Sequence, residues 1–191
     1  MPSESLAADY FERLYAADAD PWSFATSRYE LDKYEDTVAA LGPRYLRALE
    51  IGCSVGVLTQ RLGAHCSRLL AVDVNERALT AARARCAELP QVTFARASIP
   101  DGFPAGRFDL VVVSEVAYYW SDADLDRARE RIASSLEPGG DLLLVHFLPK
   151  VDDYVRDGDA VHEFFLADER FERVHCHRAE RYRLDLLRRL P

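Results

Sequence analysis

Short apolar runs alternate with amphipathic stretches along most of the chain. Five runs of four to seven residues are rich in Leu, Val, Ile and Phe, which is typical of buried strands. The stretches between them repeat apolar residues at helical spacing. The pattern predicts strands at 46–51, 68–73, 92–95, 108–113 and 141–147, with helices at 54–64, 76–88 and 122–136. Continuous apolar strands alternating with helices indicate an α/β fold, with a parallel sheet covered on both faces.

The two ends of the chain depart from this alternation. Residues 4–17 and 28–41 read as two amphipathic helices before the first strand, so we expect residues 1–42 to form a helical lid on a core at 43–191. After a helix through Val161 and Phe165, residues 173–187 alternate as two further strands around a tight turn. The expected sheet therefore has seven strands, mostly parallel, with a C-terminal antiparallel hairpin.

Composition limits the function classes. The chain has 191 residues, 49% hydrophobic and 29% charged, which suits one domain (1–191) with a sizeable core. A net charge of −8 argues against a large nucleic-acid interface. The start of the chain, Met1-Pro2-Ser3-Glu4-Ser5, does not resemble a secretory signal, and no apolar run is long enough to span a membrane. We therefore expect a cytoplasmic protein with reduced cysteines and no metal site.

The segment Glu50-Ile51-Gly52-Cys53-Ser54-Val55-Gly56 follows the first strand and leads into a helix. Glycines in such a turn allow a ligand to approach the backbone, and the carboxyl end of a parallel strand is where ligands bind in these folds. A dinucleotide site needs a glycine at the position of Ser54, where the pyrophosphate meets the backbone. S-adenosylmethionine has no phosphate and tolerates a side chain there. The turn therefore favours adenosylmethionine, against a packing role alone.

Two acidic residues flank this turn in the expected structure. Asp73 closes the second strand, where its carboxylate can accept hydrogen bonds from both ribose hydroxyls. The rival interpretation is that Asp73 caps the following helix. Glu50 could orient the turn backbone or face the sulfonium of the cofactor, or it could be a buried acid satisfied by backbone donors.

Several motifs together resemble those of class I adenosylmethionine-dependent methyltransferases, and more narrowly the NodS-type group. The wider resemblance covers about 45–148, and the narrower one covers nearly the whole chain. Its pieces are Tyr10-Phe11, Asp20-Pro21-Trp22, Tyr29-Glu30 with Lys33, Leu49 to Gly56, Asp73, Phe108 to Val116, Tyr118-Tyr119, Leu136 to Gly140 and Val161-His162-Glu163. The resemblance implies a Rossmann-like fold and methyl transfer. The name-giving activity of the group is N-methylation of a deacetylated glucosamine in a lipo-chitooligosaccharide.

The resemblance also implies further cofactor contacts. They are Val74, Ser98, Ile99 and Ser114 in the core, and Trp22 or Arg28 from the lid against the methionine end of the cofactor. One position departs from the wider pattern. Most class I enzymes place an acid after the third strand to accept from the adenine amino group, whereas this chain has Ser98 there. Ser98 can accept one hydrogen bond without a charge.

Methyl transfer to an amine requires a neutral amine, and hence a base or a proton relay near the acceptor. Candidates follow strands four and five: Glu115 first, His146 second, and Tyr118 as a relay. We expect Tyr118 and Tyr119 to contact the acceptor, with His162 reaching the same pocket from its rim. The alternatives are that Glu115 only holds its loop and that His146 is a satisfied core histidine.

The partner predicted by these residues is a small-molecule methyl acceptor, an amine or an amino sugar. Acidic residues in the first forty positions and at 152–159 could attract such a cation, although they also serve solubility. Two alternatives stay open: a hydroxyl or carboxyl acceptor, and a cofactor-binding protein without turnover. The sequence does not distinguish a monomer from a homodimer.

Overall fold

The computed structural model describes residues 4–191, which form two compact units. The N-terminal unit comprises residues 7–98, and the C-terminal unit comprises residues 4–6 and 99–191. Residues 1–3, part of the segment that argued against a secretory signal, lie outside the described residues. The expectation of a single domain stays a prediction.

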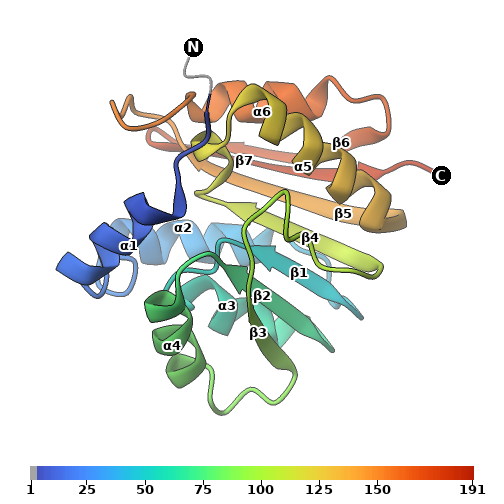
Figure 1. The fold of residues 1–191 in the computed structure, drawn as a ribbon. Helices are drawn as coiled ribbons and strands as arrows, with labels where there is room; N and C mark the ends of the chain where they lie inside the picture. The colour runs from blue at the N-terminus through green and yellow to red at the C-terminus, as the bar shows by residue number, and fades with distance from the viewer. Residues whose placement is uncertain (1–3) are drawn as a thin grey trace. The chain divides into compact units, whose positions relative to one another are not determined.

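The N-terminal unit is a three-stranded parallel sheet with helices. Its strands lie in the order β3-β2-β1, with Ile51 opposite Val72 and Asp73 opposite Arg96 (Figure 1). Its elements are α1 (Ala8–Ala17), α2 (Arg28–Ala39), β1 (Ala48–Ile51), α3 (Val57–Leu62), the 3₁₀ turn η1 (Gly63–His65), β2 (Leu69–Asp73), α4 (Glu76–Arg85) and β3 (Val92–Arg96). The predicted helix at 4–17 begins only at Ala8, and Leu6 precedes it.

The core of this unit explains why the predicted periodicity holds. Every residue of β1 is buried, and α4 turns Ala78, Leu79 and Ala82 inward with no exposed surface. Cys53, Ala71 and Leu79 pack in one cluster against Phe94. The first strand and the start of its following turn are therefore fixed by side chains that leave water together.

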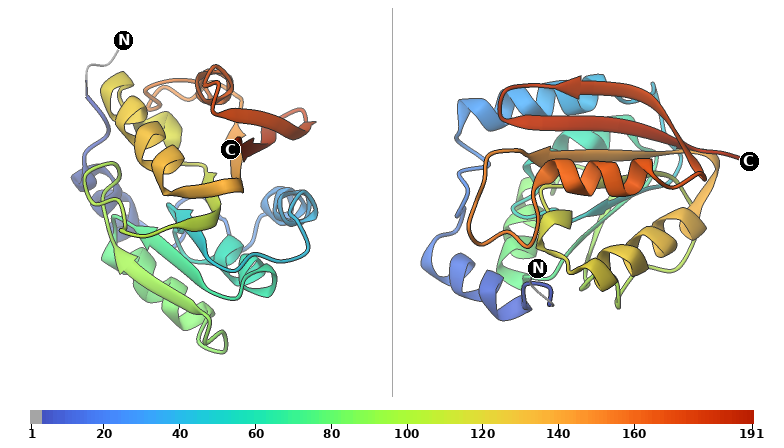
Figure 2. Two further views of the ribbon diagram at one scale, coloured as in Figure 1. Left: turned by 90° about the vertical axis from the view of Figure 1, so that its right-hand side faces the viewer. Right: turned by 90° about the horizontal axis from the view of Figure 1, so that it is seen from above.

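The C-terminal unit holds four strands in the order β4-β5-β7-β6. β4 and β5 run parallel, whereas β7 is antiparallel to both β5 and β6. The right-hand view of Figure 2 shows β5, β6, β7 and α6 of this unit. Its elements are β4 (Phe108–Ser114), the 3₁₀ turn η2 (Ala117–Tyr119), α5 (Asp122–Ser135), β5 (Leu136–Phe147), α6 (Gly158–Leu166), β6 (Phe171–Arg178) and β7 (Tyr182–Arg189).

Strand β5 is longer than predicted because its first residues also pair with β4. Phe108 lies opposite Leu136, but Leu110 lies opposite Asp141, so the chain bulges between these two pairs. The bulge contains Pro138, Gly139 and Gly140, which the sequence marked as a turn. From Leu142 to Val145 the strand is completely buried.

The fold class is confirmed: the chain forms a seven-stranded, mostly parallel α/β sheet of the class I methyltransferase type with a C-terminal antiparallel hairpin. The hairpin joins β6 and β7 with the predicted turn after Arg178. Among the described residues, no helix has the length and the apolar character needed to cross a bilayer.

Candidate functional site

The turn between β1 and α3 is the centre of the N-terminal unit's candidate site. Gly52 N and Cys53 N both donate to Val72 O, at 2.8 and 3.0 Å, which ties the turn to the end of β2. Gly52, Ser54 and Gly56 have φ values of 79°, 48° and 80°. These left-handed conformations are easy for glycine and uncommon for serine, so Ser54 must be held by its surroundings.

Gly56 has a second reason to be glycine. A Cβ atom at this position would lie 2.8 Å from both Cα and Cβ of Ala82 in α4, well inside van der Waals contact. The start of α3 therefore approaches α4 at a distance that only glycine permits, as the last glycine of such turns does in α/β folds.

Asp73 fixes the turn from the neighbouring strand. Its carboxylate accepts hydrogen bonds from Ser54 N at 2.8 Å and from Asn75 N at 2.9 Å, one on each oxygen. Burial raises the pKa of Asp73, and the backbone donors oppose that rise. A carboxylate has about four acceptor positions, so two backbone donors leave room for two ribose hydroxyls.

The alternative that Asp73 caps α4 is wrong. The cap is Asn75, whose side-chain oxygen accepts from Arg77 N at 2.9 Å and Ala78 N at 3.1 Å. Asp73 lies two residues before the cap and points its carboxylate at the glycine turn. Ribose binding by Asp73 stays a prediction that this geometry fits.

Glu50 is a buried acid at the end of β1, with only 2% of its surface exposed. Its Oε2 atom has no hydrogen-bond partner among the described residues. Burial raises the pKa of Glu50 to about 8, opposed by the Thr59 hydroxyl and supported by the nearby charge of Asp73. An unpartnered buried carboxylate oxygen is costly unless a cation or a donor reaches it.

Helix α1 contacts the turn and the cap of α4 through two residues that the sequence did not single out. The Tyr15 hydroxyl lies 2.5 Å from Ser54 Oγ, and the Glu12 carboxylate accepts from Asn75 Nδ2 at 2.9 Å. Burial raises the pKa of Tyr15, so its hydroxyl stays protonated. The only available signal was their place on a predicted amphipathic helix, because neither belongs to a recognisable motif.

The segment between α1 and α2 is organised by Asp20. Its carboxylate accepts from Phe24 N at 2.9 Å and Ala25 N at 2.8 Å, which folds the Asp20-Pro21-Trp22 segment into a turn. Trp22 then packs edge-on against Tyr15, with ring centroids 5.6 Å apart. Arg28, expected to meet the cofactor, is instead an exposed residue of α2 that pairs with Asp32 at 2.9 Å.

The remaining predicted cofactor residues divide between the two units. Val74 and Cys53 lie in the N-terminal unit beside the turn, and Ser98 is an exposed residue at its end. Ile99 and Ser114 are buried residues of the C-terminal unit, and Ser114 lies opposite Val145 in the sheet. Their contacts with a cofactor stay predictions.

Glu115 is the centre of a hydrogen-bond network in the C-terminal unit. Its Oε2 accepts from the Tyr118 hydroxyl at 2.7 Å and from Phe147 N at 3.0 Å, while its own N donates to Val145 O. Its φ of 55° is unusual for a glutamate, and such strain is often kept at functional positions. Glu115 thus holds its loop, and its half-buried carboxylate also stays the first candidate for the base.

Two further tyrosine rings pack against Tyr118, the hydrogen-bond partner of this carboxylate. Tyr118 stacks on Tyr154 with centroids 3.9 Å apart, and Tyr119 packs edge-on against both rings. The Tyr154 hydroxyl donates to the Tyr118 hydroxyl at 3.2 Å. Burial and the charge of Glu115 raise the pKa of Tyr118, so it serves as a neutral donor, and a tyrosinate base is disfavoured. Tyr154 was missed because it lies in a loop without a motif.

The placement of the two histidines argues against their predicted roles. His146 and His162 are completely buried, and His146 Nδ1 lies 3.1 Å from His162 Nε2. His146 Nε2 accepts from Ala117 N, and His162 Nδ1 contacts Asp185 Oδ2 at 2.7 Å. Since every ring nitrogen is engaged inside the unit, His146 is not placed to act as the base, nor His162 to line an acceptor pocket.

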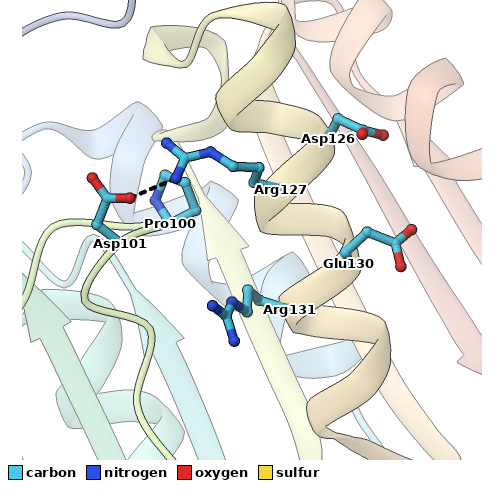
Figure 3. A pocket seen from close by; sticks show the side chains of 6 residues that line it. All are labelled: Pro100, Asp101, Asp126, Arg127, Glu130 and Arg131. Atoms are coloured by element: carbon cyan, nitrogen blue, oxygen red, sulfur yellow. Dashed lines mark hydrogen bonds and ion pairs between the residues drawn. The ribbon is translucent and has the colours of Figure 1, made fainter.

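A separate surface pocket of the C-terminal unit lies beside α5. Figure 3 shows Arg127 reaching from α5 to Asp101, with which it pairs at 2.6 Å, while Asp126 and Glu130 point away. These are exposed ion pairs, which contribute little. The pocket includes none of the candidate site residues.

Comparison with known proteins agrees with the geometry of both units. The family model of Nodulation protein S (NodS) matches residues 4–151. The chain belongs to the NodS family. Nodulation protein S of Sinorhizobium fredii is 32% identical over 131 residues, covering 66% of this chain and 60% of that protein. The corresponding protein of Rhizobium tropici is 33% identical, covering 69% of this chain and 56% of that protein.

A solved NodS structure is similar over nearly its whole length. The crystal structure of the N-methyltransferase NodS from Bradyrhizobium japonicum in complex with S-adenosyl-L-homocysteine has a TM-score of 0.83 and 27% identity. The match covers 95% of this chain and 97% of that one. The chain spans roughly 60% of the length of the curated NodS proteins that it matches, from 56% to 64%.

Proposed function

We propose that this NodS-family chain is an S-adenosylmethionine-dependent N-methyltransferase that acts on a small amine or an amino sugar. The observation that carries the proposal is the Gly52–Gly56 turn held open by Asp73, in a chain that resembles a NodS protein solved with adenosylhomocysteine. The described residues fit that cofactor because Glu50 has an unpartnered carboxylate oxygen and Asp73 has acceptor capacity left.

The N-terminal unit would hold the cofactor. Backbone groups of Gly52, Cys53, Ser54 and Gly56 accommodate its methionine and ribose, and Asp73 accepts from the ribose hydroxyls. Glu50, whose pKa is raised to about 8 in the protein without ligand, would ionise more readily beside a sulfonium or ammonium group, which stabilises its charged form. Val74 and Ser98 are assigned to the adenine, as is Ile99 of the C-terminal unit, and Trp22 is assigned to the methionine end. Arg28 would have to leave Asp32 to contribute.

The C-terminal unit would receive the acceptor. A protonated amine is attracted to the ring faces of Tyr118, Tyr119 and Tyr154 and to the Glu115 carboxylate. Glu115 then takes the proton that the amine must lose before its lone pair can attack. The Tyr118 hydroxyl, held protonated, fixes the orientation of that carboxylate through its 2.7 Å bond.

Adenosylmethionine, when bound, supplies a methyl group made electrophilic by the sulfonium. The nitrogen–carbon bond forms as the carbon–sulfur bond breaks, and the bonding pair returns to sulfur. The residues of the chain contribute alignment, exclusion of water and the acceptance of one proton at Glu115. No metal enters this scheme.

The test is incubation of the protein with labelled adenosylmethionine and a panel of amines, amino sugars, hydroxyl and carboxyl compounds. We expect one methyl to be added to nitrogen, detected by mass spectrometry with fragmentation. Adenosylhomocysteine should bind in titration calorimetry. Failure to bind that product would overturn the proposal, and methylation on oxygen would replace it with the hydroxyl or carboxyl alternative. Binding without turnover across the panel would favour a non-catalytic protein.

Glu115→Gln tests the base. The amide keeps acceptor capacity for Phe147 N but cannot take a proton, so kcat should fall by about 100-fold while adenosylhomocysteine affinity stays within twofold. Tyr118→Phe, which removes only the orienting donor, should cost less, about tenfold. An unchanged kcat in Glu115→Gln would leave Glu115 with its loop-holding role alone.

A further inference from the structure

The C-terminal unit contains a buried chain of polar groups that the proposed chemistry does not use directly. It runs from Asp185 on β7 through His162 on α6 to His146 on β5, and ends at the backbone N–H of Ala117 in η2. All three side chains are completely buried. All four imidazole nitrogens and Asp185 Oδ2 are hydrogen-bonded in this network, whereas Asp185 Oδ1 has no hydrogen-bond partner among the described residues.

The direction of each hydrogen bond follows from its two ends. Ala117 N can only donate, so His146 Nε2 must accept and carry no proton. His146 is then protonated on Nδ1 and donates to His162 Nε2, 3.1 Å away. His162 is likewise protonated on Nδ1 and donates to Asp185 Oδ2 at 2.7 Å. Both imidazoles are neutral in this arrangement, and each carries its proton on Nδ1.

The electrostatics of the network agree with a neutral His162 beside an ionised Asp185. Burial lowers the pKa of His162, against the opposing effect of Asp185. Burial alone would raise the pKa of Asp185, but the hydrogen bond from His162 and the charge of Arg183 hold it below its ordinary value. Arg183 Nε contacts the same Oδ2 atom at 2.7 Å, and Arg173 lies 3.7 Å from Oδ1.

At its Ala117 end, this buried hydrogen-bond network contacts the residues that are assigned to the acceptor. The His146 ring packs edge-on against the Tyr118 ring, with centroids 5.4 Å apart, and its Nε2 holds Ala117, one residue before Tyr118. His146 precedes Phe147, whose N–H donates to Glu115. The same imidazole therefore sits between the two backbone segments that place the tyrosine and the glutamate.

Gly158 allows this arrangement. It begins α6, and a Cβ atom there would lie 2.4 Å from Phe147 O and 3.1 Å from His146 Cβ. Only a glycine lets α6 approach β5 closely enough for His162, one turn further along the helix, to reach His146. The contact between the two histidines therefore depends on the glycine at position 158.

We propose that Asp185, His162 and His146 are positioning residues, which lock η2 so that Tyr118 and Glu115 keep the geometry needed to receive and deprotonate the acceptor. This inference rests on the proposed function for its catalytic consequence, but its structural content stands independently. The tautomer of His146 can be measured directly. If Nε2 carried the proton, two donors, Nε2–H and the N–H of Ala117, would face each other.

The first experiment is long-range ¹H–¹⁵N correlation NMR on the full chain with labelled histidine, at a pH near 7. We expect both His146 and His162 as Nδ1–H tautomers, whereas free imidazole favours the Nε2–H form. In His162→Phe, the Nδ1–H of His146 loses its acceptor, so the preference for this tautomer should weaken and rest on the donor of Ala117 N alone. A wild-type His146 with its proton on Nε2 would overturn the inference, whether or not any variant folds and whether or not any acceptor turns over.

The second experiment measures turnover. His162→Phe should lower kcat by about tenfold through misplacement of η2 while the affinity for adenosylhomocysteine stays within twofold. His162→Gln, whose amide can both accept and donate, should recover most of the loss. His175→Phe, a change of the same kind at an exposed residue of β6, is the control. Wild-type kcat in His162→Phe would overturn the positioning role, and absence of turnover in every protein would instead count against the proposed function.

Discussion

Glu50 in the N-terminal unit and Asp185 in the C-terminal unit are both almost completely buried, yet their pKa values move in opposite directions. Burial raises that of Glu50 to about 8, and its Oε2 atom has no hydrogen-bond partner among the described residues. Burial acts on Asp185 too, but His162 and Arg183 outweigh it and lower the pKa. Each carboxylate has one oxygen without a hydrogen-bond partner among the described residues, Glu50 Oε2 and Asp185 Oδ1. Asp185 differs in that the Arg183 guanidinium and the His162 imidazole contact its other oxygen and offset the cost of burial.

This difference between Glu50 and Asp185 reflects two different ways in which the two units form a site. In the N-terminal unit, one local turn presents backbone and an undercompensated acid, an arrangement that a cationic ligand would complete. In the C-terminal unit, side chains from β5, α6 and β7 hydrogen-bond to one another and hold a small set of residues in place. The first arrangement suits cofactor binding, and the second suits precise placement of an acceptor.

The largest expected effect is on pH-dependent stability. Between pH 4.5 and 8, folded Glu50 keeps its proton while the unfolded chain releases it, so the free energy of unfolding must fall as pH rises. Across this window the loss is on the order of 4 kcal/mol. Glu50→Gln mimics the protonated acid and should remove this slope. Urea denaturation of both proteins from pH 5 to pH 8 measures the difference, in which other groups cancel.

Asp185 should show the opposite dependence. Its lowered pKa contributes stability that is present above the ordinary range of aspartate and is lost on acidification. If the free energy of unfolding of the wild type changes with pH at the same rate as that of Glu50→Gln, Glu50 is ionised in the folded protein. The contrast between the two carboxylates would then disappear.

The next prediction compares the cost of alanine at one glycine of each unit, Gly56 and Gly139. Gly56 and Gly139 have φ values of 80° and 79°, so alanine is strained at both. Only at Gly56 would the new Cβ clash, at 2.8 Å from Ala82, whereas at Gly139 nothing lies within 4 Å. We expect Gly56→Ala to cost about 3 kcal/mol and Gly139→Ala about 1 kcal/mol in urea denaturation. Equal costs would show that strain alone, and not close packing of α3 on α4, requires the glycine.

Asp73→Ala tests whether the N-terminal unit binds the ribose of the cofactor through Asp73. The variant removes the acceptor of Ser54 N and Asn75 N as well as the proposed ribose contact, so adenosylhomocysteine should bind at least about tenfold more weakly in calorimetry. Asp73→Asn, which keeps one carbonyl oxygen, should lose less. Unchanged affinity in Asp73→Ala would remove the ribose assignment and leave Asp73 as a structural support for the turn.

Arg28→Ala should have the smallest effect. The side chain is exposed and pairs with Asp32 within the same helix, so affinity for adenosylhomocysteine should change by less than about twofold. Weakening by tenfold or more would instead restore Arg28 as a ligand for the methionine carboxylate. Trp22→Ala, measured beside it, tests the neighbouring prediction from the same segment.

Most of the fold could be predicted because its signals are local. Buried parallel strands are continuous apolar runs, and helices between them repeat every three to four residues, so α4 and α5 were found to within a few residues. The boundaries that moved, at Leu6 and at Leu136, depend on contacts with distant segments. Leu6 N donates to Tyr119 O, and Leu136 pairs with Phe108, neither of which leaves a periodic trace nearby.

The candidate site also contains some features that are encoded locally and others that depend on contacts between distant segments. The sequence by itself determined the glycine turn and the carboxylate at the end of β2, because a tight turn and a strand end must be encoded by residues a few positions apart. Only the tertiary structure decided that Asn75 caps α4, that Tyr15 contacts Ser54 and that Tyr154 contacts Tyr118. It also decided that His146 and His162 are joined in one buried network with Asp185. Those partners are up to 39 residues apart, as between Tyr15 and Ser54. Their contacts exist only because packing brings separate elements together, where most buried polar groups hydrogen-bond to one another.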